Sequence, residues 1–256
     1  MIKLIASDID GTLLQNGETE ISSRFFREAE RLMKQGVAVC AASGRQYKSL
    51  RHLFAPLADR MYFLCENGAV VYMPGEPPKL LSKTVIDRAL SLELCRDILE
   101  IPDCELLISG SNMSYLCPKT ESYLDHIRYF VGNNVTILNS PQEMPEDFVK
   151  ISAYYLPGAE RLEPMLVSKW GKRLGAAIAG KCWLDFTLAD KATGIRALYT
   201  ALNVTAEETV AFGDNYNDVP MLDAVGHPYI MASAAESLRQ RYADQCVRPE
   251  DVMEKL

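Results

Sequence analysis

The sequence predicts an α/β protein, in which a doubly wound, Rossmann-like parallel sheet is interrupted by an inserted α+β domain. At both ends of the chain, short apolar runs alternate with amphipathic helical patterns, as in parallel strands buried beneath helices. In the middle, apolar runs are joined by short turns, which is typical of an α+β domain. We therefore expect core segments at 1–82 and 184–256, with the inserted domain at 83–183.

The first core segment has the pattern of a βαβ unit followed by a hairpin. The expected elements are a strand at 2–6, a helix capped by Ser22 or Ser23 and ended by Gly36, a strand at 37–42, and hairpin strands at 61–65 and 69–72. The turn-rich segment Met73–Pro78 follows, so we expect the hairpin to lead out of the core.

The remaining elements follow from the same patterns. In the insertion we expect helices at 87–99, 121–131 and 160–170, and strands at 105–108, 114–117, 149–156 and 182–187. In the second core segment we expect helices at 191–202, 219–224 and 234–242, alternating with strands at 209–212 and 229–232.

Composition excludes several classes of protein. The chain is 48% hydrophobic and 24% charged, as in soluble globular proteins. Its net charge of −7 lacks the basic excess that nucleic-acid backbones require. No window reaches the roughly 18 apolar residues of a membrane span, and the N-terminal run is too short for a signal peptide. The 7 cysteines show no CxxC spacing, so we expect a cytoplasmic protein. From the charge and the lack of an apolar span, we expect neither nucleic-acid nor membrane partners.

Polar clusters follow three of the predicted strands. These clusters are Asp8-Ile9-Asp10-Gly11-Thr12, Ser43-Gly44-Arg45 and Gly213-Asp214-Asn215-Tyr216-Asn217-Asp218. In open parallel sheets, ligands bind beyond the carboxyl ends of the strands. We therefore expect the three clusters to meet in one crevice.

The acidic residues of these clusters favour a magnesium site. Asp8 and Asp10 are two residues apart, so both side chains point the same way in an extended segment. With Asp214 nearby, the carboxylates would repel one another unless a cation lay between them, and oxygen ligands suit Mg²⁺. Taken singly, Asp-Gly is also a common turn, and the segment from Asp214 is also a helix-capping loop. An EF-hand is excluded, because Val219 replaces the required glycine.

Together these clusters resemble the four motifs of the haloacid dehalogenase superfamily. The Asp8, Ser43 and Asp214 clusters stand in the family's order, with Lys191 before a late helix as the third motif. The segment Cys65-Glu66-Asn67-Gly68-Ala69 and the long insertion are similar to its Cof-type phosphatase branch, which carries a type 2 cap.

The resemblance implies a mechanism for hydrolysing phosphate esters. Asp8 would be the nucleophile that forms an aspartyl-phosphate, and Asp10 would protonate the leaving alcohol and then activate water. Dehalogenases of the superfamily lack this second aspartate, so Asp10 favours a phosphatase. Ser43 and Lys191 would hold the transferring phosphoryl oxygens.

The resemblance also implies a metal site and a substrate site. Mg²⁺ would be held by Asp8, the backbone carbonyl of Asp10 and Asp214, and residues Asn217 and Asp218 would order its surroundings. The candidate substrate-binding residues are Gly44, Arg45 and Asn67, with Asn112, Tyr115, Lys119, Lys181 and Trp183 as further candidates in the insertion.

Two positions depart from the family pattern. Ala192 follows the motif lysine where the family usually has glycine, and Ala232-Ser233-Ala234 stands where Cof-type proteins often have Gly-Asn-Ala. The second departure affects a loop that could contact the substrate. Neither departure removes a residue that the phosphoryl step requires.

Several functions stay open at this point. The leading one is a phosphatase of small phosphorylated metabolites such as sugar phosphates, acting as a monomer or homodimer. A phosphomutase on the same core would instead pass the phosphoryl group to a second hydroxyl. A non-catalytic phospho-acceptor would also place an aspartate and Mg²⁺ at strand ends, but such modules are about half this length and lack a partner like Asp10.

Overall fold

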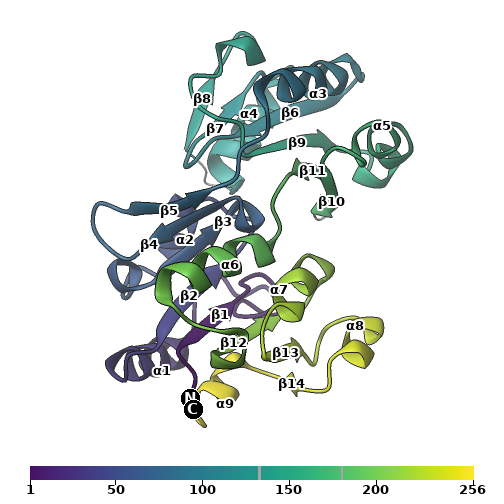
Figure 1. The fold of residues 1–256 in the computed structure, drawn as a ribbon. Helices are drawn as coiled ribbons and strands as arrows, with labels where there is room; N and C mark the ends of the chain where they lie inside the picture. The colour runs from purple at the N-terminus through teal and green to yellow at the C-terminus, as the bar shows by residue number, and fades with distance from the viewer. Residues whose placement is uncertain (132–133, 180) are drawn as a thin grey trace. The chain divides into compact units, whose positions relative to one another are not determined.

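The computed structural model describes residues 1–131, 134–179 and 181–256, and the chain forms two compact units (Figure 1). Unit 1 combines Met1–Ser82 with Asp190–Leu256, and unit 2 is the insertion Lys83–Ala189. Unit 2 extends past the expected boundary at residue 183 because strand β11 (Trp183–Thr187) pairs with strands of the insertion.

Unit 1 is built on an eight-stranded sheet with the order β14-β13-β12-β1-β2-β3-β4-β5. Its strands are β1 (Leu4–Ser7), β2 (Ala38–Ala42), β3 (Tyr62–Cys65), β4 (Val70–Met73), β5 (Lys79–Lys83), β12 (Thr209–Gly213), β13 (His227–Met231) and β14 (Gln245–Cys246). The neighbours from β14 to β3 pair in parallel, and β4 runs antiparallel to β3. The central strands are buried on both faces, which explains their continuous apolar sequences.

Helices cover both faces of this sheet. They are α1 (Ser23–Lys34), α2 (Tyr47–Leu53), α6 (Lys191–Leu202), α7 (Val219–Asp223), α8 (Glu236–Arg241) and α9 (Pro249–Met253). On one face, Phe25 of α1 and Phe63 of β3 both make edge contacts with the ring of Phe54. On the other face, Ile195 of α6 and Met221 of α7 join the buried core beneath the sheet. The predicted doubly wound α/β architecture is therefore confirmed.

Unit 2 contains a six-stranded sheet with the order β10-β11-β9-β6-β7-β8. Its strands are β6 (Cys104–Ser109), β7 (Ser114–Leu116), β8 (Val135–Ile137), β9 (Lys150–Tyr155), β10 (Gly175–Ala179) and β11 (Trp183–Thr187). All pairings are antiparallel except that of β7 with β8. Helix α3 (Arg88–Glu100) buries Leu94 and Ile98 in the core that also holds Leu106 of β6 and Ile151 of β9.

Two expected helices of the insertion are irregular in the structure. The segment 160–170 consists of a 3₁₀ turn (Ala159–Arg161), a π-helical stretch (Glu163–Val167) and a short α5 (Ser168–Trp170). Pro164 contributes to this irregularity, because proline lacks the N–H that a regular helix uses. The helix expected at 121–131 is α4 (Glu121–Asp125) followed by a π-helical turn.

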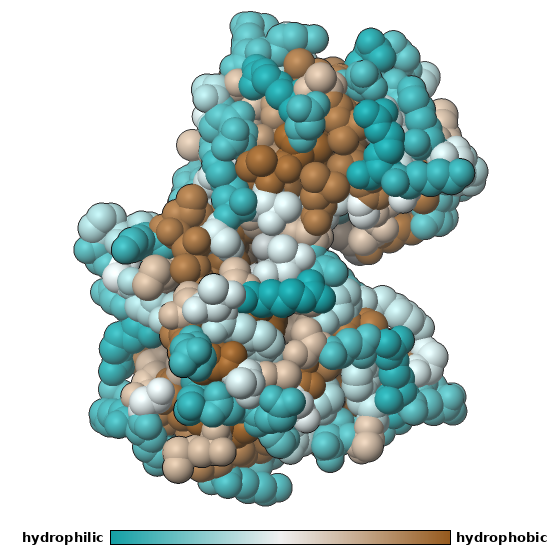
Figure 2. Space-filling model, in the orientation of Figure 1, coloured by the Kyte–Doolittle hydropathy of each residue, from teal (hydrophilic) through white to brown (hydrophobic). Residues whose placement is uncertain are grey.

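The surface of unit 2 carries apolar side chains. Figure 2 shows hydrophobic residues gathered where Figure 1 places β9, below α3 in this view, with hydrophilic residues around them. Large exposed apolar residues of this unit are Val85, Ile137, Leu156, Met165, Ile178 and Leu188. Among the described residues, no helix has the length and apolar character to span a membrane.

Helix α6 approaches the sheet closely at Gly194, where an added Cβ would lie 2.3 Å from Leu64 Cδ1. We expect Gly194→Val to lower the free energy of unfolding by about 1–3 kcal/mol through overpacking, measured by urea denaturation. The control is Ala201→Val on the exposed side of the same helix, which tests the effect of a β-branched residue alone. Equal stability of the two variants would contradict this packing argument.

Candidate active site

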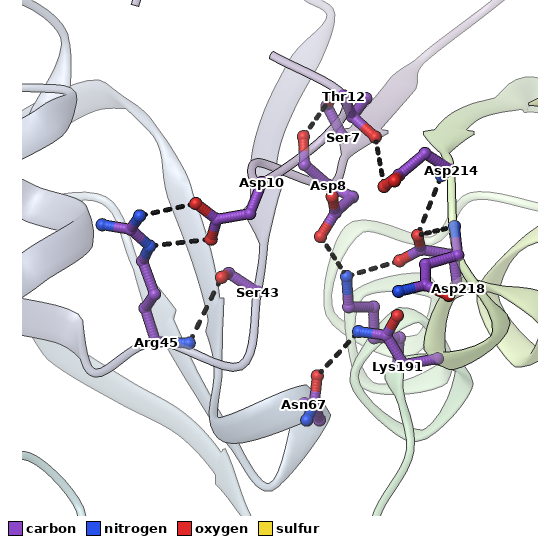
Figure 3. A network of polar contacts seen from close by, with 12 residues as sticks. Ser7, Asp8, Asp10, Thr12, Ser43, Arg45, Asn67, Lys191, Asp214 and Asp218 are labelled. Atoms are coloured by element: carbon purple, nitrogen blue, oxygen red, sulfur yellow. Dashed lines mark hydrogen bonds and ion pairs between the residues drawn. The ribbon is translucent and has the colours of Figure 1, made fainter. Parts of the chain in front are cut away.

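Three strand ends of unit 1 bring the predicted clusters together (Figure 3). In the sheet register, Ser7 of β1 lies opposite Phe212 of β12 on one side and Ala41 of β2 on the other. The three strands therefore end at the same edge, where Asp8, Ser43 and Asp214 follow them. This placement agrees with the crevice expected from the sequence.

A buried lysine joins two of these carboxylates. Lys191, the first residue of α6, places its Nζ 2.5 Å from Asp8 Oδ1 and 2.5 Å from Asp218 Oδ1. Lys191 and Asp218 are 0% exposed, and Asp8 is 5% exposed. Burial lowers the pKa of Lys191, but the Asp218 and Asp8 carboxylates raise it by more, so the ammonium stays charged.

Asp218 also organises the loop that follows β12. Its Oδ2 accepts hydrogen bonds from the backbone N–H groups of Asp214, at 3.0 Å, and Asn215, at 3.1 Å. Both carboxylate oxygens of Asp218 are thus engaged, one by this loop and one by Lys191. Gly213 is needed here, because an added Cβ would lie 2.5 Å from Asp218 Cβ. The helix-capping interpretation of this segment is therefore correct. Asp218, which takes part in the cap, also contacts the candidate catalytic residue Lys191.

The carboxylates of Asp8, Asp214 and Asp218 form a compact acidic group. One oxygen of each lies within 4.8 Å of the others. Burial and the neighbouring Asp218 raise the pKa values of both Asp8 and Asp214, despite the opposing effect of Lys191. A hard cation beside Asp8 and Asp214 would relieve this repulsion, and all of the donors are oxygen atoms. The residues present thus fit Mg²⁺.

Two residues that follow Asp8 and Asp10 in the first motif hold the side chain of Asp214 in place. Thr12 Oγ1 donates a hydrogen bond to Asp214 Oδ1 at 3.2 Å. Gly11 has φ +95°, and an added Cβ would lie 2.2 Å from Asp214 Oδ2, so only glycine fits there. Thr12 is not among the site residues predicted from the sequence, although it belongs to the polar cluster Asp8–Thr12 that follows β1.

Asp10 points away from Asp8 and pairs with Arg45, so the expectation that both side chains point the same way is wrong (Figure 3). The Arg45 guanidinium donates two hydrogen bonds, from Nε to Asp10 Oδ2 at 2.8 Å and from Nη2 to Asp10 Oδ1 at 2.5 Å. The Asp10 side chain is 56% exposed, so this pair lies at the open side of the site. The bidentate geometry holds the Asp10 carboxylate in one orientation.

The second motif is linked to the segment after β3. Ser43 is buried, and its Oγ accepts a hydrogen bond from the Arg45 backbone N–H at 3.2 Å, while its carbonyl accepts one from the N–H of Asn67. An added Cβ on Gly44 would lie 3.2 Å from Asn67 Nδ2, so the two loops are closely packed. Asn67 Oδ1 in turn accepts a hydrogen bond from Asn217 Nδ2 at 3.4 Å.

The substrate candidates in unit 2 do not form one cluster. Tyr115 is buried in the apolar core and donates to Glu146, and Lys119 Nζ donates to the carbonyl of Ile101. The remaining candidates lie elsewhere: the Asn112 carbonyl accepts from Asn134, Lys181 is exposed, and Trp183 packs against Tyr154. The contacts of Tyr115 and Lys119 stabilise unit 2 itself.

The two departures from the family pattern have different settings. Ala192 is 1% exposed in the first turn of α6, where the helix is already capped by Asp190, which accepts from the Thr193 N–H. Its methyl group is part of the core. Ser233 is exposed in the turn after β13.

The fold and this acidic site define a known class of hydrolase. Residues 5–249 match the family model of haloacid dehalogenase-like hydrolases, and the chain belongs to this family, as its motifs indicated. Among its relatives, 5-amino-6-(5-phospho-D-ribitylamino)uracil phosphatase YbjI of Escherichia coli is 26% identical over 247 residues, covering 93% of this chain and 88% of the relative. YitU of Bacillus subtilis, which is named for the same phosphatase activity, is 27% identical over 254 residues, covering 93% of this chain and 89% of the relative. A crystal structure of a protein from Eubacterium rectale superimposes with a TM-score of 0.90 at 25% identity, covering 99% of this chain and 98% of that one.

The buried ion network predicts a large effect of removing its cation. We expect Lys191→Met to lower the free energy of unfolding by about 3–5 kcal/mol, because Asp8 and Asp218 would be left buried without a counter-charge. Urea denaturation in metal-free buffer measures this. Lys34→Met is the control, since the Lys34 side chain is 71% exposed and should tolerate the change. Similar losses in the two variants would refute the argument.

Proposed function

We propose that the protein is a Mg²⁺-dependent phosphatase of small phosphorylated metabolites that acts through an aspartyl-phosphate. The observation that carries this proposal is the convergence of Asp8 and Asp214 at one sheet edge, with buried Lys191 in contact with Asp8. The named activity of the Escherichia coli and Bacillus subtilis relatives supports it, and suggests a phosphate ester of a hydroxylated carbon chain as the substrate.

In the first step, an oxygen of the Asp8 carboxylate attacks phosphorus, and the bond from phosphorus to the ester oxygen breaks. The leaving oxygen takes a proton from the carboxyl group of Asp10. In the second step, Asp10 removes a proton from water as the water oxygen attacks phosphorus. The bond between phosphorus and Asp8 then breaks, which releases inorganic phosphate and restores both residues.

The structure supports a change in the position of Asp10 during this cycle. Its carboxylate is held by Arg45 at the open side of the site, and it is more than half exposed. Arg45 can also donate to an anionic substrate, because its guanidinium is a fork that matches phosphate oxygens. A substrate that engages Arg45 would release Asp10 to reach the leaving oxygen.

Charge is the main obstacle to this reaction, since an anionic carboxylate must approach an anionic phosphate ester. Lys191 supplies a fixed positive charge, and Ser43 supplies a hydroxyl at the neighbouring strand end. Asp8, the carbonyl of Asp10 and Asp214 would hold Mg²⁺, with Asn217 and Asp218 around them. When bound, Mg²⁺ supplies further charge neutralisation at the phosphoryl oxygens.

The remaining assignments belong to the same proposal. Gly44, Arg45 and Asn67 would contact the substrate from two adjoining loops, which their mutual packing supports. A cytoplasmic location is supported by the 7 cysteines, all of which are free thiols.

The reaction can be tested with a panel of phosphorylated sugars, polyols and nucleotides. We expect inorganic phosphate to be released from at least one member with Mg²⁺, and the activity to disappear when a chelator removes the metal. Phosphate and alcohol should form in equal amounts. Isomerised phosphate ester without free phosphate would instead identify a phosphomutase.

The nucleophile can be tested on the best substrate of that panel. We expect Asp8→Asn to lower kcat by roughly 10³-fold or more, because an amide cannot form the acyl phosphate. Asp244→Asn is the matched control, since Asp244 is exposed in the same unit away from the site. Near-normal turnover by Asp8→Asn would disprove the proposed mechanism.

The role of Asp10 predicts a dependence on the leaving group. We expect Asp10→Asn to lower kcat/KM about 10²–10⁴-fold for alkyl phosphates, whose leaving alkoxide needs a proton. The loss should be much smaller for 4-nitrophenyl phosphate, whose leaving group is stable as an anion. Steady-state kinetics on the two ester classes measures this, and equal losses would argue against proton donation by Asp10.

A further inference from the structure

One side chain of unit 1 connects the loop after β1 to the C-terminal part of the chain. Gln15 is 9% exposed, and its Nε2 donates two hydrogen bonds, to the Thr12 carbonyl at 2.9 Å and to the Val247 carbonyl at 2.8 Å. An amide nitrogen carries two hydrogens, so both donors of this side chain are used. Val247 lies between β14 and α9, 232 residues from Gln15. The proposed reaction assigns no role to Gln15.

The backbone of Gln15 is held independently of these two contacts. Its N–H donates to Glu18 Oε2 at 3.0 Å, and its carbonyl accepts from the Glu18 N–H at 2.9 Å. Asn16 and Gly17, with φ of 52° and 81°, reverse the chain between the two residues. Arg248 in turn donates two hydrogen bonds to the Glu18 carboxylate, at 2.9 and 2.7 Å. The Gln15 side chain therefore starts from a fixed point.

The contact with Thr12 lies next to the candidate metal site. Thr12 is 0% exposed, and its Oγ1 donates to Asp214 Oδ1 at 3.2 Å. The Thr12 carbonyl is shielded from water, so loss of the Gln15 amide would remove a donor that solvent cannot replace. A buried carbonyl without a donor costs free energy, and rotation of its peptide toward another donor would reduce that cost. Such a rotation would carry the Thr12 hydroxyl away from Asp214.

The rest of the loop is held by its own backbone. The Ile9 carbonyl accepts hydrogen bonds from the N–H groups of Leu13, at 2.9 Å, and Leu14, at 2.8 Å. The Gly11 N–H donates to the Leu14 carbonyl at 2.8 Å. These contacts do not involve the side chain of Gln15. Its influence on the loop is therefore concentrated at Thr12.

From these contacts we infer that Gln15 is a positioning residue for the candidate Mg²⁺ site. It acts through Thr12, which orients the Asp214 carboxylate, and it takes its second support from Val247. Removing a group that orients a metal ligand typically weakens metal binding about 10–100-fold. The inference rests on the proposed function for the identity of the cation, and all of its contacts lie within unit 1.

Metal affinity measures this role without relying on catalysis. Mn²⁺ is a suitable probe, because carboxylate and carbonyl oxygens bind it as they bind Mg²⁺, and EPR spectroscopy measures the free ion. Gln15→Met keeps the length of the side chain and removes both donors. We expect this variant to raise the Kd for Mn²⁺ about 10–100-fold.

Arg248→Met is the matched control for this measurement. It breaks the surface ion pair of Arg248 with Glu18, whose side chains are 30% and 39% exposed, and this pair joins the same two segments as Gln15 does. It leaves both hydrogen bonds of the Gln15 side chain in place. We therefore expect the Kd for Mn²⁺ to change less than about twofold.

A double-mutant cycle tests whether Gln15 acts through Thr12. Thr12→Val removes the hydroxyl that donates to Asp214 and keeps the shape of the side chain. In this background, Gln15→Met should raise the Kd for Mn²⁺ less than about threefold, because the contact that Gln15 supports is already absent. An equal fold increase in the two backgrounds would overturn the inference.

A shorter side chain covers the case in which Gln15→Met fails to fold. Gln15→Asn retains the amide but lacks one methylene group, so it cannot reach both carbonyls. We expect it to raise the Kd for Mn²⁺ at least about threefold. A purely structural role predicts a lower free energy of unfolding, measured by urea denaturation, with an unchanged Kd. A wild-type Kd in either folded Gln15 variant would therefore refute the positioning role.

The outcome for Gln15 can be separated from that for the proposed function. Wild-type protein that binds Mn²⁺ but hydrolyses no phosphate ester would contradict the phosphatase, while the comparison of Kd values would still decide the role of Gln15. Equal Kd values for wild type and Gln15→Met would contradict that role alone. Wild-type protein that does not bind Mn²⁺ would contradict both, because there would be no metal site to position.

Discussion

The contact of Lys191 with Asp8 and Asp218 is the constraint on which the candidate active site depends. A lysine at the first position of a helix faces the positive end of the helix dipole, and burial disfavours its charge further. Two carboxylates at 2.5 Å compensate for both effects. Because Asp8 follows β1 while Lys191 and Asp218 belong to the second core segment, this contact also joins the two halves of unit 1 on either side of the insertion.

The carboxylates of this site are not equally compensated by positive charge and hydrogen bonds. Asp218 is satisfied by Lys191 and by two backbone N–H groups, whereas Asp8 and Asp214 have raised pKa values because they are crowded and partly buried. In the proposed mechanism, a site with this balance would hold the nucleophile in place and attract a divalent cation. The pair of Asp10 and Arg45 is more exposed, and in the proposed reaction both groups would exchange partners when an anionic substrate binds.

The charged residues of the two units are arranged differently. Unit 1 concentrates charge at a parallel sheet edge, which suits the stabilisation of a phosphoryl group. Unit 2 instead carries a polar sheet face on which Lys150 Nζ lies 3.4 Å from Asp185 Oδ2.

The sequence by itself determined the α/β class, the interruption of the core and the residues at the ends of β1, β2 and β12, because hydrophobic periodicity and strand-end polarity are local properties. It missed β10, whose run of glycine and alanine lacks a strand pattern, and it predicted a regular helix at 160–170. Only the tertiary structure decided that Asp218 serves both a loop and Lys191, that Arg45 holds Asp10, and that Lys150 meets Asp185. Apart from the hydrogen bonds within the 214–218 loop, those contacts join residues far apart in the chain. Their geometry follows from strand register and helix packing, which no local pattern encodes.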